Sequence, residues 1–177
     1  MKKFGKLLSA LAVAVIGLAT LVSCGGYNFY NVMTEAGAII DKDHCYEVIE
    51  IEDAKNKIEA DETFILALGS PISKTANTIG IIDEQSEIFN FEGKIYFIDV
   101  EDEIKNIEDR NTLNKDLGIS NSADAKTNLI IVIYNKGEVL IDTTNKASYD
   151  DFEWFAADNS VDYYALAAYM FNDLKFE

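Results

Sequence analysis

Residues 63–71 read TFILALGSP, and this stretch decides the fold. Five apolar side chains follow Thr63 without a break, and a Gly-Ser-Pro sequence then ends the run. A run this short, bounded by turn residues, is typical of a strand that is buried on both faces of a sheet. The sequence therefore predicts a central strand over residues 63–68, with other elements covering both of its faces.

A long helix is predicted directly after this strand. Only Gly80 interrupts the segment from Ser73 to Asn90, and apolar side chains recur in it at helical spacing, at Ala76, Ile79, Ile82 and Phe89. The pattern indicates a helix of about four to five turns. Ser73, at its start, is predicted to be the N-cap.

Two further apolar runs extend the sheet. Residues 95–100 (IYFIDV) predict a second buried strand, and residues 129–134 (LIIVIY) and 138–142 (EVLID) flank an Asn-Lys-Gly turn that predicts a β-hairpin. Two strands joined by a long helix pair in parallel through a right-handed crossover, and the hairpin adds antiparallel strands. The fold class that follows is α/β, with a mixed central sheet and helices on both faces.

The remaining segments predict shorter elements. The expectations are a helical turn or two within residues 27–40, a strand over 46–52 and a helix over 54–60 capped by Asp53. Residues 101–117 predict one or two surface helices with a narrow apolar stripe made of Ile104, Ile107, Leu113 and Leu117. Ser148 followed by Asp151 resembles a capping box, which predicts a helix to Leu174 with a break at residues 158–160.

The N-terminal segment predicts a targeting signal. Three lysines precede an apolar run over residues 7–20, which is too short for a comfortable transmembrane helix and is typical of a secretory signal peptide. Residues 21–24, Leu-Val-Ser-Cys, resemble the lipobox of bacterial lipoproteins. The resemblance implies cleavage after Ser23 and a diacylglyceryl group on Cys24.

This interpretation divides the chain into three parts. Residues 1–23 are the expected lipoprotein signal peptide, residues 24–44 the lipidated cysteine and a tether, and residues 45–177 the folded domain. The expected location is the extracytoplasmic face of a cell membrane, with the N-terminal lipid as the anchor.

Composition excludes several classes of function. The 177 residues carry 15 basic and 31 acidic side chains, a net charge of −16, which becomes −19 when the three lysines of the signal peptide are removed. Such a chain lacks the cations needed to bind a nucleic-acid backbone or an anionic membrane surface. One His and two Cys exclude a multi-Cys/His zinc module and a disulfide scaffold.

No metal site or cofactor is predicted. Acidic residues cluster at 99–103 and 150–153, but neither cluster has the alternating Asp pattern and glycine of a calcium-binding loop. No glycine-rich phosphate loop is present. Aromatic residues crowd the segment after residue 150, where most are expected to be core and the rest are candidates for a partner surface.

The order of the segments resembles the thioredoxin-like superfamily. Residues 64–71 look like the strand and turn that deliver that family's active-site helix, residues 95–100 like its next strand, and residues 130–138 (IIVIYNKGE) like its hairpin. The resemblance covers residues 46–174 and is closest to small exported, bacteriocin-transport accessory-type members. It implies a thioredoxin-like domain carried on a bacterial lipoprotein.

The departures from that family predict a domain without dithiol chemistry. Thioredoxin-type exchange needs a Cys-x-x-Cys at the start of the helix, where Ser73 and Ala76 stand here. The family's cis-proline position falls in the Thr127-Asn128-Leu129 segment, which contains no proline, so a trans loop is expected. The protein is therefore not expected to be a dithiol enzyme.

Two functions remain open. The first is a binding or accessory module that holds a protein or peptide partner in a groove, with Gly69, Ser70, Pro71, Ser73, Thr127 and Asn128 as its candidate residues. The second is a single-thiol redox protein that uses Cys45, which is the only thiol left once Cys24 is lipidated. An inert buried cysteine is the commoner case, and the binding module is favoured.

Overall fold

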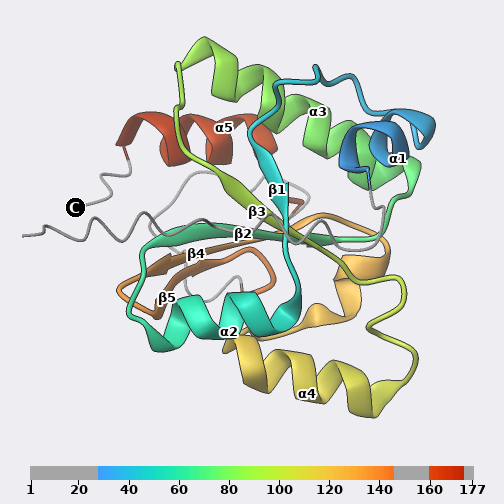
Figure 1. Cartoon of the computed structure of the whole chain (residues 1–177), viewed down its shortest axis with the longest axis vertical. Coiled ribbons are helices and arrows are strands. Elements are labelled where there is room, and N and C mark those ends of the chain that lie inside the picture. Colours follow the sequence, from blue (N-terminus) through green and yellow to red (C-terminus); the bar gives the residue numbers. More distant parts are fainter. Residues whose placement is uncertain (1–27, 146–159, 174–177) are drawn as a thin grey trace, which may run out of the picture.

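The computed structural model describes residues 28–145 and 160–173, which fold around one five-stranded sheet. Its strands β1, β3 and β2 are parallel neighbours, whereas β4 is antiparallel to β2 and β5 is antiparallel to β4. The α/β class with a mixed central sheet is thus confirmed. Figure 1 shows the strands in the spatial order β1-β3-β2-β4-β5; they are β1 (Tyr46–Val48), β2 (Phe64–Gly69), β3 (Ile95–Asp99), β4 (Ile130–Asn135) and β5 (Glu138–Asp142).

Helices cover both faces of the sheet (Figure 1). One face carries α1 (Phe29–Glu35), α3 (Ser73–Ile88) and α5 (Tyr163–Ala168), with a π-helical turn η3 (Tyr169–Asp173) after α5. The other face carries α2 (Ile51–Glu59) and α4 (Ile107–Leu117), followed by a 3₁₀ helix η1 (Ser122–Lys126). The two sets of helices explain why the strands are apolar on both sides.

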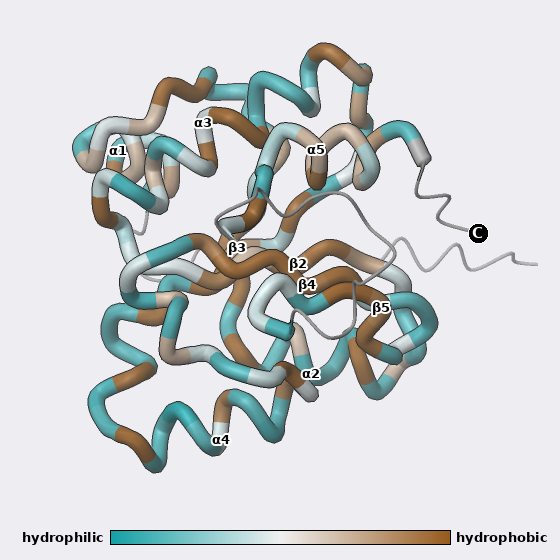
Figure 2. The backbone as a smooth tube through the Cα atoms, turned by 180° about the vertical axis from the view of Figure 1, so that it is seen from behind, coloured by the Kyte–Doolittle hydropathy of each residue, from teal (hydrophilic) through white to brown (hydrophobic). Residues whose placement is uncertain are grey.

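The alternation of side chains along β2 divides the interior into two cores. Ile65 and Ala67 pack under α1, α3 and α5, whereas Phe64, Leu66 and Leu68 pack against the side of α2 and α4. Every residue of β2 is buried. The apolar residues of β2, β3 and β4 accordingly run through the middle of the molecule in Figure 2.

The β4–β5 hairpin turns at Lys136 and Gly137. Both residues have positive φ angles, +52° and +74°, as a type I′ turn requires. A Cβ atom on Gly137 would lie 2.4 Å from the carbonyl oxygen of Ile58, and the Gly137 N–H donates to the Glu62 carbonyl at 3.0 Å. The turn therefore packs against the end of α2, where only glycine fits.

The sequence placed the start of α2 too late. Strand β1 ends at Val48 and the helix begins at Ile51, three residues before the predicted start. Asp53 is the third residue of the helix rather than its N-cap, and its Oδ2 accepts a hydrogen bond from the Glu50 N–H at 3.3 Å. Ile51, which fitted an alternating strand pattern, belongs to the first turn of the helix.

Two other local predictions are wrong. Ser73 is the first helical residue of α3, and the N-cap is Ile72, which has no side-chain acceptor. Ile107 is 67% exposed and does not belong to the buried stripe. It opens α4, whose buried positions are Leu113 and Leu117, while Ile104 is buried from the preceding loop.

The folded part begins before the predicted boundary at residue 45. Phe29 and Met33 of α1 are buried in the same core as Ile65, and the Phe29 ring stacks on Tyr46 with a centroid distance of 5.0 Å. Part of the predicted tether is therefore core. The signal peptide, Cys24, the predicted capping box at residues 148–151 and most of the predicted break at 158–160 lie outside the described residues.

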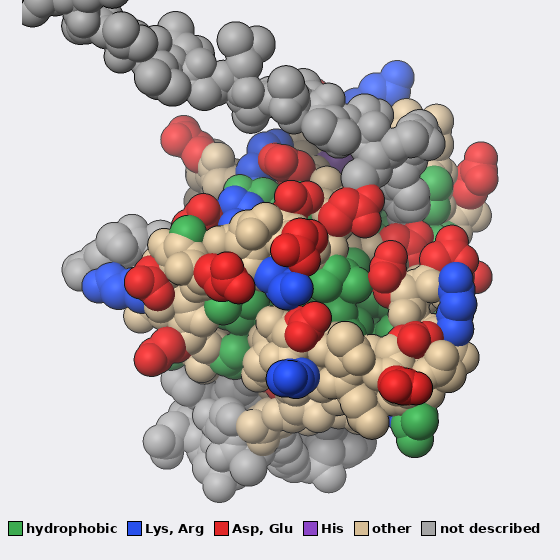
Figure 3. Space-filling model, turned by 60° about the horizontal axis from the view of Figure 1, so that its bottom comes forward, with side chains coloured by type: hydrophobic (Ala, Val, Ile, Leu, Met, Phe, Trp, Pro, Cys, Tyr) green, Lys and Arg blue, Asp and Glu red, His purple; other side chains and the backbone are tan. Residues whose placement is uncertain are grey.

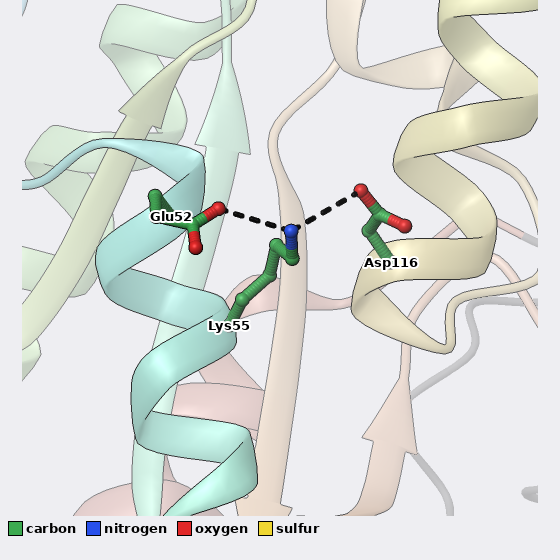
Figure 4. A network of polar contacts seen from close by, with 3 residues as sticks. All are labelled: Glu52, Lys55 and Asp116. Atoms are coloured by element: carbon green, nitrogen blue, oxygen red, sulfur yellow. Dashed lines mark hydrogen bonds and ion pairs between the residues drawn. The ribbon is translucent and has the colours of Figure 1, made fainter.

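The helices of the second face are joined by Lys55. Its Nζ lies 3.0 Å from Glu52 Oε2 within α2 and 3.8 Å from Asp116 Oδ2 on α4 (Figure 4). Acidic side chains predominate over basic ones on this face (Figure 3). The contact is one of the few places where a lysine offsets the acidic charge of the two helices.

Candidate functional site

The predicted groove residues come from two segments that meet where strand β2 ends and strand β4 begins. This border of the sheet, at the ends of its central strands, is called the sheet edge. Strand β2 ends at Gly69, and α3 begins at Ser73 after a short turn. Beside this turn lies the segment that leads into β4, and the Ser70 N–H donates to the Ala125 carbonyl at 3.1 Å. The structure thus brings the two halves of the predicted site together.

The exposed part of this edge is smaller than the sequence suggested. Gly69 and Ser70 are buried, Pro71 is half-buried, and Ser73 is exposed. On the opposite segment Thr127 is exposed and Asn128 is half-buried. The accessible side chains at this edge are therefore those of Pro71, Ser73, Thr127 and Asn128, while Gly69 and Ser70 lie buried beneath them.

Gly69 is required by its surroundings. A Cβ atom there would lie 2.8 Å from Thr75 Cγ2 and 3.2 Å from Leu129 Cδ1, closer than side-chain atoms normally approach. The Thr75 hydroxyl is buried and has no hydrogen-bond partner among the described residues. The first turn of α3 and the end of β2 consequently pack too closely for any residue larger than glycine at position 69.

The segment before β4 is held in place on both sides. The Asp124 carbonyl accepts hydrogen bonds from the Thr127 and Asn128 N–H groups at 2.9 and 2.8 Å. The Tyr163 hydroxyl of α5 donates to the Leu129 carbonyl, and burial raises the pKa of this tyrosine to about 12. Peptide bonds in this segment are trans, and no cis peptide occurs among the described residues.

Ser73 and Ala76, the two residues that the predicted thioredoxin-like resemblance aligns with a dithiol, differ in exposure. Ser73 is exposed at the first helical position, whereas Ala76, three residues later, is completely buried. A serine hydroxyl has no accessible anion at neutral pH without a nearby base, and alanine has no reactive group. The start of α3 therefore offers a surface but no nucleophile.

Cys45 is buried and protonated. Its side chain is 7% exposed, its N–H donates to Asp83 Oδ1 at 3.3 Å, and its Sγ donates to the same oxygen at 3.6 Å. Burial, with a smaller contribution from Asp83, raises the pKa of the thiol to about 12. At pH 7 the thiolate fraction is then about 1 in 100,000, too small for an efficient nucleophile.

His44 does not activate this thiol. Its Nδ1 accepts a hydrogen bond from the Tyr46 N–H at 3.3 Å, and its ring lies 5.0 Å from the Phe29 ring. Burial lowers the pKa of His44, so the ring is mostly neutral at neutral pH. The imidazole is a packing element beside Cys45 rather than its base.

Asp83 is the polar residue that sequence reasoning missed. It lies on α3 among its buried positions and is 3% exposed, and burial raises the pKa of its carboxyl. The sequence does show an acidic residue directly after the apolar Ile82 in the predicted helix. What the sequence did not show is that α3 places it opposite Cys45, 38 residues earlier in the chain.

Two hollows on the outer side of α3 were also missed. One is lined by the segment after α1, by α3 and by α5, through Ile39, Asp41, Gly80, Glu84, Glu87 and Tyr164 among others. The other surrounds His44, Cys45 and Ser86. Asp83 lines both, so the hollows adjoin one another.

The acidic residues at 99–103 form no metal site within the part of the chain that the structure describes. No group of three or more His, Cys, Asp or Glu side chains there is arranged to hold a metal ion, and the cluster at 150–153 lies outside the described residues. No helix within residues 28–145 and 160–173 is both long and apolar enough to cross a bilayer.

The chain matches no protein-family model, and no curated protein sequence matches it.

Proposed function

We propose that the protein is a lipid-anchored, extracytoplasmic binding module built on a thioredoxin-like domain without thiol chemistry. In this proposal it holds a protein or peptide partner at the sheet edge formed by Gly69, Ser70, Pro71, Ser73, Thr127 and Asn128. No catalytic step is assigned to it.

One observation carries the proposal: the turn before α3 and the segment before β4 meet through the Ser70–Ala125 hydrogen bond. This contact creates a surface from two separate segments, with Ser73 and Thr127 exposed on either side. Both segments are fixed by buried contacts, so their exposed groups keep one arrangement. A preorganised surface loses less entropy when a partner binds.

The sheet order supports the thioredoxin-like assignment. The helix that starts beside the candidate site follows central strand β2, and the hairpin strands β4 and β5 continue the sheet beyond it. This order is compatible with a thioredoxin-like fold. The exposed Ser73 and buried Ala76 also have the spacing of an attacking and a resolving cysteine.

Site-specific photo-crosslinking in intact cells tests the binding surface. A photoreactive phenylalanine analogue is placed at Ser73 or at Thr127, with exposed Thr112 on α4 as the matched control position. The proposal expects the same crosslinked partner from both site positions and not from Thr112. Different partners at Ser73 and Thr127, or equal yields at all three positions, would contradict it.

A gain-of-function variant tests the fold assignment. The Ser73→Cys/Ala76→Cys double variant is expected to catalyse insulin reduction, because a dithiol at the start of α3 gains the chemistry that the native residues lack. The wild-type chain is expected to show no turnover. The Thr112→Cys/Lys115→Cys variant, with the same spacing on α4, controls for nonspecific thiols.

The anchor is tested separately. Cys24→Ala is expected to leave an unprocessed precursor or to release the protein from the membrane fraction. Recovery of the variant with membranes at the mature size would contradict lipidation at Cys24.

A further inference from the structure

A solvent-facing groove lies on the side of α3 that faces away from the sheet. Its apolar lining includes Ile39 from the segment after α1, Ile81 of α3 and Tyr164 of α5. Ile39 is 90% exposed and Tyr164 is 52% exposed. Large apolar side chains this exposed are a small minority in the described residues, and two of them line one groove.

The exposed position of Ile39 is built into the fold. Its neighbours Ala38 and Ile40 are buried, at 7% and 8% exposure. The backbone of Ile39 lies directly on α3, where a Cβ atom on Gly80 would be 3.1 Å from the Ile39 carbonyl oxygen. Glycine at position 80 permits this approach, and the segment holds the isoleucine side chain out into solvent.

Tyr164 is fixed in a similar way. Asp162 caps α5 by accepting hydrogen bonds from the Tyr164 and Ala165 N–H groups at 3.0 and 3.1 Å. Leu166 and Ala167 of the same helix are buried in the core. The two exposed apolar side chains are therefore presented by anchored backbone on either side of α3.

The charged groups that line the groove are all acidic. Asp41, Glu84 and Glu87 are exposed on its rim, and no lysine or arginine of the described residues lines it. Ion pairs among the described residues involve only Lys55 and Lys57 on α2, so the rim carboxylates have no cationic partner there. From Asn77 to Glu87 the groove follows α3 for roughly 15 Å, the length of about three helical turns.

We propose that this groove binds a cationic amphipathic peptide segment, in which lysine or arginine side chains accompany large apolar ones. The apolar side chains of such a segment contact Ile39 and Tyr164, and its cations contact the three rim carboxylates. Charge complementarity selects this occupant: a second copy of the chain, at −16, and an anionic membrane are both repelled. The site is independent of the sheet edge proposed above.

The test measures binding of a fluorescein-labelled peptide of fourteen residues, with leucine at helical i, i+3, i+4, i+7 spacing and lysine elsewhere. A second peptide carries glutamate in place of lysine. Fluorescence anisotropy is followed with the full chain in non-ionic detergent at low and high NaCl concentration, with detergent alone as the blank. Saturable binding of the lysine peptide that weakens in high salt, without binding of the glutamate peptide, is expected.

Matched variants localise the binding. Glu84→Gln/Glu87→Gln is expected to weaken the lysine peptide about tenfold at low salt, because rim charges act through screened attraction. Glu59→Gln/Glu108→Gln removes the same charge from exposed positions on α2 and α4, on the opposite side of the sheet, and is expected to change the affinity less than twofold. Ile39→Ser and Tyr164→Ser are each expected to weaken binding about fivefold at both salt concentrations.

Three results would overturn the proposal. The first is an equal loss of affinity in the two double glutamine variants, which would mean that the peptide is attracted by net charge alone. The second is unchanged affinity in both serine variants. The third is the absence of saturable binding to the wild-type chain. Circular dichroism of each variant checks that the fold is retained, and since all substituted side chains are exposed, the comparison does not depend on a disrupted core.

Discussion

Asp83 joins α3 to the segment that leads into β1, through its bonds from the Cys45 N–H and Sγ. Burial raises the pKa of its carboxyl, so the folded chain holds this proton to a higher pH than the unfolded chain, whose aspartates titrate near 3.8. The stability linked to that proton is fully present below about pH 4 and is lost as the pH rises through the raised pKa. An ionised Asp83 is thus a cost to folding.

Asp83→Asn should remove this pH dependence. The amide oxygen still accepts from Cys45 and carries no charge, so the free energy of unfolding should lose the decline that begins above about pH 4, and it should exceed that of the wild type once the wild-type carboxyl is ionised. Urea unfolding at a series of pH values measures both effects, with Glu84→Gln, at the exposed neighbouring position, as the control. A uniform loss of stability at every pH would show that the carboxylate itself is needed.

Cys45 should react slowly in the folded protein. With its pKa at about 12 instead of 9.0, the thiol should be labelled by a disulfide reagent at pH 7 about a thousandfold more slowly than in denaturant. The experiment uses the full chain with Cys24→Ala, so that Cys45 is the only thiol, and Cys24→Ala/Cys45→Ser as the blank. Rapid labelling without denaturant would favour the single-thiol redox alternative.

At the scale of secondary structure, α4 depends on its N-terminal cap. The Asn106 Oδ1 accepts hydrogen bonds from the Glu108 and Asp109 N–H groups at 2.7 and 3.0 Å, and Asp109 Oδ2 accepts from the Asn106 N–H at 3.1 Å. Asn106→Ala should lower the free energy of unfolding by about 1 kcal/mol. Asn111→Ala, an exposed position inside the same helix, should have no destabilising effect. Equal effects of the two substitutions on the urea midpoint would contradict the role of the cap.

The strands were predictable because their information is local. The apolar runs at 63–68 and 95–100 and the Asn-Lys-Gly turn each correspond to an observed strand or turn. The start of α2 was not predictable in the same way, since Ile49 and Ile51 fit both an alternating strand and a helix start. The choice depends on Asp53 reaching back to Glu50, which a pattern of apolar residues does not record.

At the scale of the whole molecule, one of the two proposed binding surfaces could be predicted from the sequence and the other could not. Ser73 and Thr127 could be proposed from sequence because the strand order brings the end of β2 and the start of β4 to one edge. The groove at Ile39 and Tyr164 could not, because it needs the contact between Gly80 and Ile39 and the docking of α5 on α3. The contact between Gly80 and Ile39 and the docking of α5 on α3 are tertiary contacts between segments that are distant in sequence, and no sequence pattern links these segments.

The acidic charge of the chain should make its free energy of unfolding increase with salt concentration. With a net charge of −16 and ion pairs confined to Lys55 and Lys57 among the described residues, repulsion between carboxylates outweighs attraction. Screening should therefore stabilise the folded state, by about 1 kcal/mol between low and 0.5 M NaCl, which corresponds to about 2–4 °C in Tm. Choline chloride at the same ionic strength should produce a similar rise, while sucrose at matched osmolality separates screening from solute exclusion. A fall in Tm with salt would mean that attractive pairs dominate, and the groove on α3 would then lose its argument from unpaired rim charges.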